Sequence, residues 1–148
     1  MPLIDFSYPA GTFESATLAT LLDELAGTML HWEGAPDNEF FRSITWVYPH
    51  ERTPVIGGRV PGDARFRIDV TVPAGALSDR RKAGLVDGLT TVVLKAAGLE
   101  PAEAGRVWVL LNEVPDGNWG AGGTIIRLSQ LAEAAKAGRA EAEAAPTG

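Results

Sequence analysis

Asp5-Phe6-Ser7-Tyr8-Pro9-Ala10-Gly11 returns 64 residues later (73 − 9) as Asp69-Val70-Thr71-Val72-Pro73-Ala74-Gly75. The same register continues through the residues that follow. Leu21, Leu22, Leu25, Met29 and Gly34 align with Leu85, Val86, Leu89, Val93 and Gly98. After a loss of two residues, Trp46-Val47 and Glu51 align with Trp108-Val109 and Glu113. The chain is therefore a tandem repeat, and both copies are expected to fold in the same way.

Each copy opens with the pattern of a strand. Apolar and polar residues alternate over residues 4–8 and again over residues 66–72, which is the period of a strand with one buried face. The Pro-Ala-Gly that follows is expected to end the strand, because proline donates no ladder hydrogen bond and glycine permits a turn.

Beyond these turns the pattern takes the period of a helix. One apolar stripe runs along each copy, formed by Leu18, Leu21, Leu22, Leu25 and Met29 in the first and by Leu85, Val86, Leu89, Val92 and Val93 in the second. Ser78 predicts a helix start as an N-cap followed by Asp79, and Gly98 predicts a stop. Branched and aromatic residues then predict strands at about 43–48 and 106–111.

A strand–helix–strand unit pairs its strands in parallel through a right-handed crossover. Two such units predict an α+β fold with a four-stranded mixed sheet and two helices on one face. No further amphipathic helix of similar quality is available to cover the other face. We therefore expect the chain to form a symmetric oligomer.

The chain is expected to hold one domain, residues 1–131, built of two units at about 2–48 and 65–128. Residues 49–64, which are rich in proline, glycine and charge, form the connector. Residues 132–148 are rich in Ala and Glu and end in Pro-Thr-Gly. We expect them to be a flexible tail with at most a short, fraying helix.

Composition excludes several classes of function. The net charge of −6 argues against binding of nucleic acid, which needs clustered Lys and Arg. No apolar run approaches the ~18 residues of a membrane span, and the absence of cysteine fits a reducing cytoplasm. His31 and His50 lack the spacing of a zinc motif, so no metal is expected.

The glycines of residues 117–123 do not indicate a nucleotide site. Ile125 stands where a dinucleotide motif needs its third glycine, and the lysine of a P-loop is absent. A β-hairpin that needs positive φ values explains these glycines better. No cofactor is expected.

Pro2 is the residue that could carry chemistry. If Met1 is removed, Pro2 bears a free secondary amine, and its strand parity with Ile4 and Phe6 places it at the mouth of the sheet. An α-amino group has a pKa of about 7.7–8.0, which burial lowers. Such a group can act as a general base or as a nucleophile. The second copy has Phe66 at this position, so one site per chain is predicted.

The sequence Val107-Trp108-Val109-Leu110-Leu111-Asn112-Glu113-Val114-Pro115-Asp116-Gly117-Asn118-Trp119-Gly120-Ala121-Gly122-Gly123 resembles the second strand and hairpin of the 4-oxalocrotonate tautomerase family. The short members of that family are single βαβ units whose amino-terminal proline is the base. The chain looks like a fused, two-unit member of the tautomerase superfamily. Its length is similar to that of cis-3-chloroacrylic acid dehalogenase and malonate semialdehyde decarboxylase, which are trimers. The resemblance implies a tautomerase/MIF-like fold, Pro2 as base and a homotrimer.

The resemblance also implies substrate-binding residues. Trp119 matches the aromatic residue that walls the proline, although a hairpin tryptophan packed against a neighbouring subunit would look the same. The family's substrate-binding arginines are replaced here by Thr12, Leu77, Trp46 and Trp108; the two tryptophans are expected to pack in the core or at an interface. Arg80 or Arg81, one helical turn further on, could supply the cation, although solvated charges on the helix face are the favoured interpretation of both. Other candidates lie near strand ends at Arg42, Arg65 and Arg67.

These observations favour a cytoplasmic tautomerase that moves a proton on a small 2-oxo acid, with Pro2 as the general base. One alternative keeps the fold and performs hydration, dehalogenation or decarboxylation of a three-carbon acid. Another is a binding protein that has lost catalysis. The expected partner is a small-molecule substrate, and neither nucleic acid nor a membrane is expected.

Overall fold

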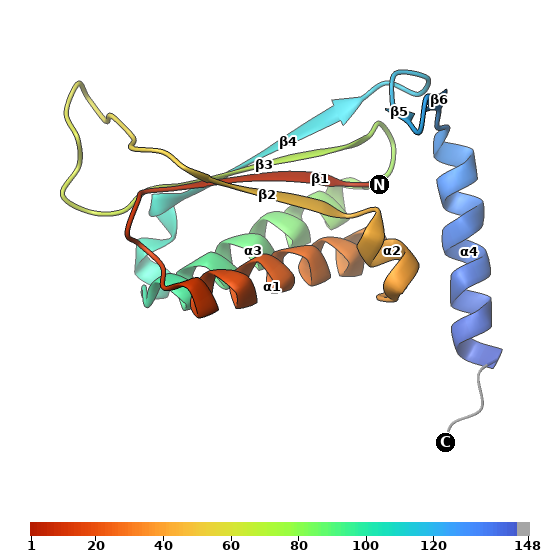
Figure 1. The fold of residues 1–148 in the computed structure, drawn as a ribbon, viewed down its shortest axis with the longest axis horizontal. Helices are drawn as coiled ribbons and strands as arrows, with labels where there is room; N and C mark the ends of the chain where they lie inside the picture. The colour runs from red at the N-terminus through yellow and green to blue at the C-terminus, as the bar shows by residue number, and fades with distance from the viewer. Residues whose placement is uncertain (145–148) are drawn as a thin grey trace.

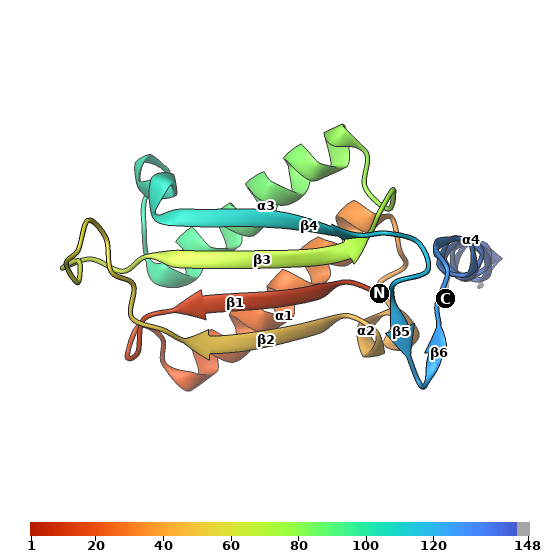
Figure 2. The same ribbon diagram turned by 90° about the horizontal axis from the view of Figure 1, so that it is seen from above.

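The computed structural model describes residues 1–144. Its centre is a four-stranded sheet in the order β2-β1-β3-β4 (Figure 2). The strands are β1 (Leu3–Tyr8), β2 (Trp46–Glu51), β3 (Phe66–Pro73) and β4 (Val107–Val114). β1 pairs in parallel with β2 and β3 in parallel with β4, while β1 and β3 are antiparallel. The predicted α+β fold, a mixed sheet made of two βαβ units, is confirmed.

Two long helices cover one face of this sheet (Figure 1). They are α1 (Ser15–Glu33) and α3 (Asp79–Ala97), and their ends are separated by the 64 residues of the repeat (79 − 15 and 97 − 33). The caps are as predicted: the Ser78 side chain accepts the backbone N–H of Arg81, and Gly98 ends α3 with a φ of 65°. Gly34 ends α1 in the same left-handed conformation.

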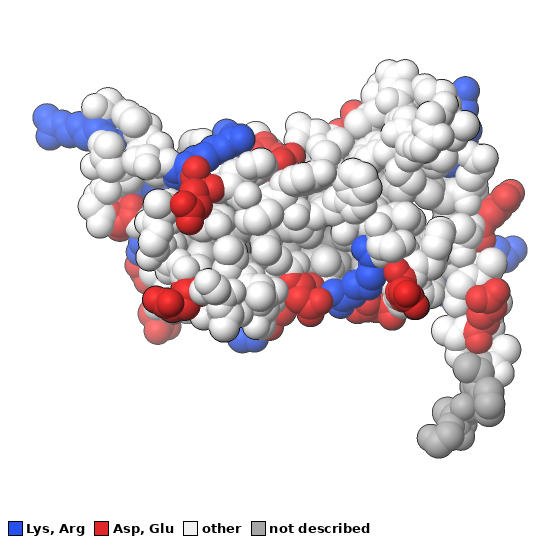
Figure 3. All heavy atoms as spheres, in the orientation of Figure 1, with Lys and Arg blue, Asp and Glu red and all other residues white. Residues whose placement is uncertain are grey.

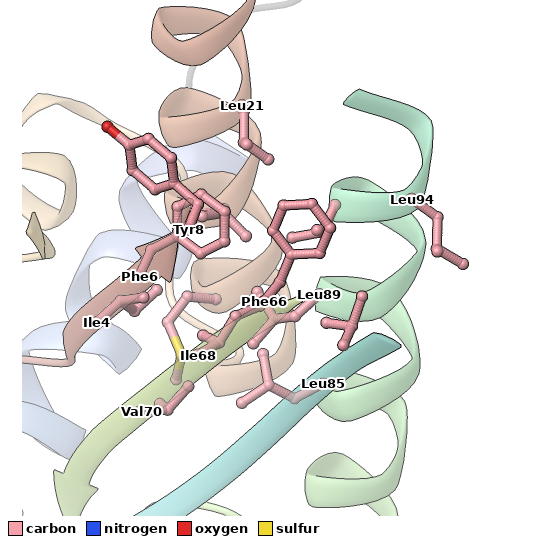
Figure 4. Close-up of a cluster of buried hydrophobic side chains, with 14 of the residues drawn as sticks. Ile4, Phe6, Tyr8, Leu21, Phe66, Ile68, Val70, Leu85, Leu89 and Leu94 are labelled. Atoms are coloured by element: carbon pink, nitrogen blue, oxygen red, sulfur yellow. The ribbon is translucent and has the colours of Figure 1, made fainter. Parts of the chain in front are cut away.

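The core lies between the sheet and the two helices, as Figure 4 shows. Ile4 and Phe6 of β1 and Ile68 of β3 are 0% exposed, and so are Leu85 and Leu89 of α3. Full burial of one such side chain stabilises the fold by about 1.5–3 kcal/mol. The alternation read in the sequence therefore identifies the buried face correctly.

The helices approach closely because α3 has glycines where Trp32 of α1 lies. A Cβ on Gly84 would stand 2.1 Å from the Trp32 ring, and one on Gly88 would stand 3.3 Å from Trp32 Nε1. This contact fixes the end of α1 against the start of α3. Arg81 Nη1 accordingly donates to the Glu33 carbonyl oxygen over 3.1 Å.

The other face of the sheet is uncovered in the single chain. Trp46 and Trp108 are 59% and 69% exposed, so the prediction that they could pack in the core is wrong, and the interface alternative stays a prediction. The outward parity of these positions is the reason: Trp46 pairs with Leu3, and Trp108 pairs with Arg67. Polar pairs such as His50–Asp5, 2.7 Å apart, share the same face.

Several short elements connect these units. A helix, α2 (Glu39–Ser43), was not predicted and delays the second strand to Trp46; the Asn38 side chain caps it. A 3-10 helix, η1 (Pro101–Arg106), leads into β4. The predicted hairpin is present as β5 (Gly120–Ala121) and β6 (Thr124–Ile125), and Gly122 and Gly123 at its turn have φ values of 60° and 78°.

The last described element is α4 (Leu128–Ala144). The Ala- and Glu-rich residues expected to form a flexible tail are helical as far as Ala144, over a greater length than the short helix expected; residues 145–148 lie outside the described part of the chain. Asp116 of the hairpin loop accepts the backbone N–H of Leu128 over 3.0 Å. None of the helices within residues 1–144 is long and apolar enough to cross a membrane.

Candidate active site

Pro2 is buried directly before the first strand. Its carbonyl oxygen accepts the backbone N–H of Trp46 over 3.2 Å, so the pairing of β1 with β2 extends to this residue. In Figures 1 and 2 the chain begins beside the β5–β6 hairpin and α4. The nitrogen of Pro2 is therefore held in place by the sheet and lies beside the β5–β6 hairpin and α4.

A cavity of about 670 Å³ lies against Pro2, and we call it the Pro2 cavity. Trp119, which the sequence predicted to wall the proline, lines it. The remaining lining residues are Met1, Leu3, Ser43, Ile44, Trp46, Thr71, Val114, Asn118, Gly120, Ala121 and Gly122. None of the lining side chains carries a charge, and in Figure 3 the hairpin region is largely white. The space suits the reacting carbons of a substrate better than an ionised group.

A second cavity, of about 240 Å³, lies on the other side of Met1, and we call it the charged cavity. Its charged side chains are Glu33 at the end of α1, Arg81 in α3 and Arg139 in α4. Met1 lines both cavities. The amino terminus thus lies at the boundary between a neutral space and a charged one.

Burial sets the protonation of this terminus. It lowers the pKa of the Met1 amine below its ordinary value, and the Glu33 carboxylate partly offsets the effect. Burial likewise raises the pKa of the Glu33 carboxyl, which the amine and Arg81 oppose. An amine with a lowered pKa is unprotonated in larger fraction near neutral pH, and it can then accept a proton or attack a carbonyl carbon.

No group of three or more His, Cys, Asp and Glu side chains within residues 1–144 could hold a metal ion. The groups available for chemistry at the chain start are therefore the amine, the Glu33 carboxylate and the two guanidinium groups of the charged cavity.

Comparison with known proteins agrees with this architecture. Residues 67–128 match the tautomerase family, described as tautomerase enzymes, and they include the β4 strand and hairpin that wall the Pro2 cavity. The second βαβ unit and the hairpin of this chain are therefore similar to the tautomerase family. No curated protein gives a significant sequence match.

Several solved structures share the fold at low sequence identity. N1, a member of the cis-3-chloroacrylic acid dehalogenase family, has a TM-score of 0.72 at 19% identity over 95% of this chain and 99% of its own. Pt0534, inactivated by 2-oxo-3-pentynoate, has a TM-score of 0.71 at 18% identity over 87% and 98% of the two chains. Q0, a fused 4-OT solved as a symmetric trimer, has a TM-score of 0.70 at 22% identity over 86% and 96%.

The arginines proposed from the tautomerase resemblance lie in different places. Arg80 is exposed on α3 and lines neither cavity, so its role in substrate binding stays a prediction. Arg81 is the next residue of α3, and its side chain points in a different direction because successive residues of a helix are turned by about 100°. Arg81 lines the charged cavity. The candidates near strand ends are held by carboxylates: Arg42 by Asp23 and Asp37, Arg65 by Asp63, and Arg67 by Asp69.

Sequence reasoning missed two charged residues of the candidate site, Glu33 and Arg139. The sequence does contain a sign of Glu33. An acidic residue just before the C-cap Gly34 is unfavourable beside the negative end of the helix dipole, so its presence indicates a role other than stabilising the helix. Arg139 had a weaker one: Gly138-Arg139 interrupts an Ala- and Glu-rich run. Nothing local to that run indicates that it packs beside the amino terminus.

Proposed function

We propose that this chain is a tautomerase in which the secondary amine of Pro2, freed by removal of Met1, is the general base acting on a small 2-oxo acid. The observation that carries the proposal is the position of Pro2, buried and paired to β2, at the edge of a neutral cavity walled by Trp119. The amine takes a proton from the carbon next to the carbonyl. It then returns that proton to the carbonyl oxygen or to a carbon further along the conjugated chain.

The surroundings support this role of the amine. Exclusion of water by the neutral cavity wall disfavours the ammonium form, as burial does for the terminus that begins at Met1. General acid–base catalysis works best when the pKa of the base lies near the working pH. A lowered amine pKa serves both steps, because the amine must accept the proton and also release it.

Reaction with 2-oxo-3-pentynoate, the compound that inactivated Pt0534, tests the proposal. We expect one molecule to add to each chain, with the Pro2 nitrogen bonded to an alkyne carbon and the amine proton moved to the neighbouring carbon. Intact mass and peptide mapping measure the adduct, and loss of enol absorbance measures the ketonisation of phenylenolpyruvate. An unmodified Pro2, or ketonisation no faster than in buffer, would contradict the proposal.

Glu33 is expected to control the pH dependence of this activity. Its negative charge raises the pKa of the Met1 amine, and we expect it to act in the same direction on a Pro2 amine one residue further along, so Glu33→Gln should lower that pKa. Arg81 and Arg139, which face the same cavity from α3 and α4, act in the same direction once the carboxylate is gone. Because the free amine is the active form, the acid limb of the pH–rate profile should move to lower pH.

The control is Glu133→Gln, which removes an exposed carboxylate of α4 that lines neither cavity and should leave the profile in place. An unchanged Glu33→Gln profile would show that the carboxylate does not act on the base, and a shift to higher pH would contradict the expected sign.

We also propose that the chain forms a homotrimer. The sheet face away from the helices carries Trp46, Trp108 and Leu110, which are 59%, 69% and 41% exposed. Contact with further copies would bury these side chains. Fused 4-OT proteins of similar fold were solved as trimers.

A further inference from the structure

Two arginines of the charged cavity have hydrogen-bonding capacity to spare. Arg81 donates to the carbonyl oxygen of Glu33, and Arg139 donates to the carbonyl oxygen of Gly34. Within residues 1–144 neither guanidinium lies in an ion pair. A guanidinium has five N–H donors in a planar fork, so both groups keep donors available for an anion.

The charge balance of the cavity favours an anion as well. Its lining holds two guanidinium groups and one carboxylate, that of Glu33. Carboxylates match the guanidinium fork in geometry and form charge-assisted hydrogen bonds with it. A small organic acid would therefore bind with its carboxylate in this cavity.

The position of Met1 connects the two cavities. Met1 lines both, and Pro2, the next residue, lines the Pro2 cavity, so removal of Met1 would leave the new amine next to the space that joins the two cavities. A 2-oxo acid has its carboxylate next to its carbonyl carbon. If its carboxylate bound at the arginines, the carbons beyond the carbonyl would extend toward the Pro2 cavity.

α4 is fixed in the position that this arrangement requires. Asp116, three residues before Trp119, accepts the Leu128 N–H and pairs with Arg127 over 3.3 Å, which ties the start of α4 to the hairpin. Further along, a Cβ on Gly138 would stand 3.2 Å from Phe41 and from Pro36. The glycine thus lets α4 pack against the α1–α2 segment and places the neighbouring Arg139 at the cavity.

We propose that α4 is part of the binding site and that its Arg139, together with Arg81, holds the substrate carboxylate while the reacting carbons lie in the Pro2 cavity. The inference rests on the proposed function for the identity of the reacting group, but the anion site itself does not depend on the amine. This anion site would make α4 a determinant of specificity for acids over neutral ketones.

The test compares Arg139→Gln with Lys136→Gln. Both remove one positive charge from an exposed residue of α4, but Lys136 lines neither cavity. The reagents are 2-oxo-3-pentynoate, which has a carboxylate, and 3-butyn-2-one, which has none. For Arg139→Gln we expect the concentration that half-saturates labelling by the acid to rise about tenfold or more, with no change in labelling by the ketone. Lys136→Gln should change neither, and Arg81→Gln should repeat the Arg139→Gln result.

Calorimetry with pyruvate as the probe separates this inference from the proposed function. If neither reagent labels Pro2 in the unaltered chain, the proposed chemistry fails. The anion site is still supported in that case if pyruvate binding weakens in Arg139→Gln but not in Lys136→Gln. Equal acid labelling in Arg139→Gln and the unaltered chain overturns the inference. So does pyruvate binding that is absent or the same in all three proteins.

Discussion

A chain that keeps Met1 is expected to catalyse proton transfer roughly 10²–10⁴-fold more slowly than the same chain beginning at Pro2, which is the usual contribution of a general base. In the longer chain the Pro2 nitrogen belongs to a peptide bond, whose resonance removes its basicity. The Met1 amine is primary, and Met1 itself occupies the boundary between the two cavities. The measurement is the ketonisation rate of two preparations whose intact masses differ by one methionine.

Two further preparations sharpen this comparison. Acetylation of the Pro2 amine should abolish the activity, because an acetylated nitrogen is again an amide. Pro2→Ala keeps a free amine once Met1 is removed, so it should retain part of the activity. Equal rates for the chains beginning at Met1 and at Pro2 would rule out the amine as the base, whereas the fold and the anion site would be unaffected.

The sequence predicts the fold well because the alternation of apolar and polar residues is a local pattern that does not depend on distant segments. Alternation over residues 4–8 and 66–72 identifies the buried face of β1 and β3, where Ile4, Phe6, Ile68 and Val70 are 0% exposed. The repeat transfers each conclusion to the other copy. The same parity places Pro2 directly before β1, where the structure has it buried; its role as a base stays a prediction.

The charged part of the site is harder to predict because it depends on packing between distant segments. Glu33, Arg81 and Arg139 come from three helices and meet only through tertiary contacts. Arg80 and Arg81 illustrate the limit. They are adjacent in the sequence and equal in charge, and only the rotation of α3 against α1 decides which one reaches the cavity. That rotation depends on how Trp32 packs on the glycines of α3.

Gly84→Ala is therefore expected to destabilise the protein, by about 2–3 kcal/mol, near the upper end of the usual cost of overpacking. Helix propensity alone predicts the opposite sign, because Ala is better than Gly inside a helix by about 1 kcal/mol. The packing term dominates here, since the new Cβ would stand 2.1, 2.3 and 2.4 Å from three atoms of the Trp32 ring. Chemical denaturation at constant m-value measures the change.

Two comparisons identify the cause of that loss. Gly105→Ala adds a Cβ that meets no atom within 4 Å at a residue without a positive φ, so it should change stability little. In a Trp32→Ala background the ring is gone, and Gly84→Ala should become neutral or stabilising by up to about 1 kcal/mol. A Gly84→Ala penalty that persists without the ring would show that the glycine acts elsewhere. If the ring is the cause, its displacement also moves the adjacent Glu33, so the single variant should alter the pH–rate profile, and Gly105→Ala should not.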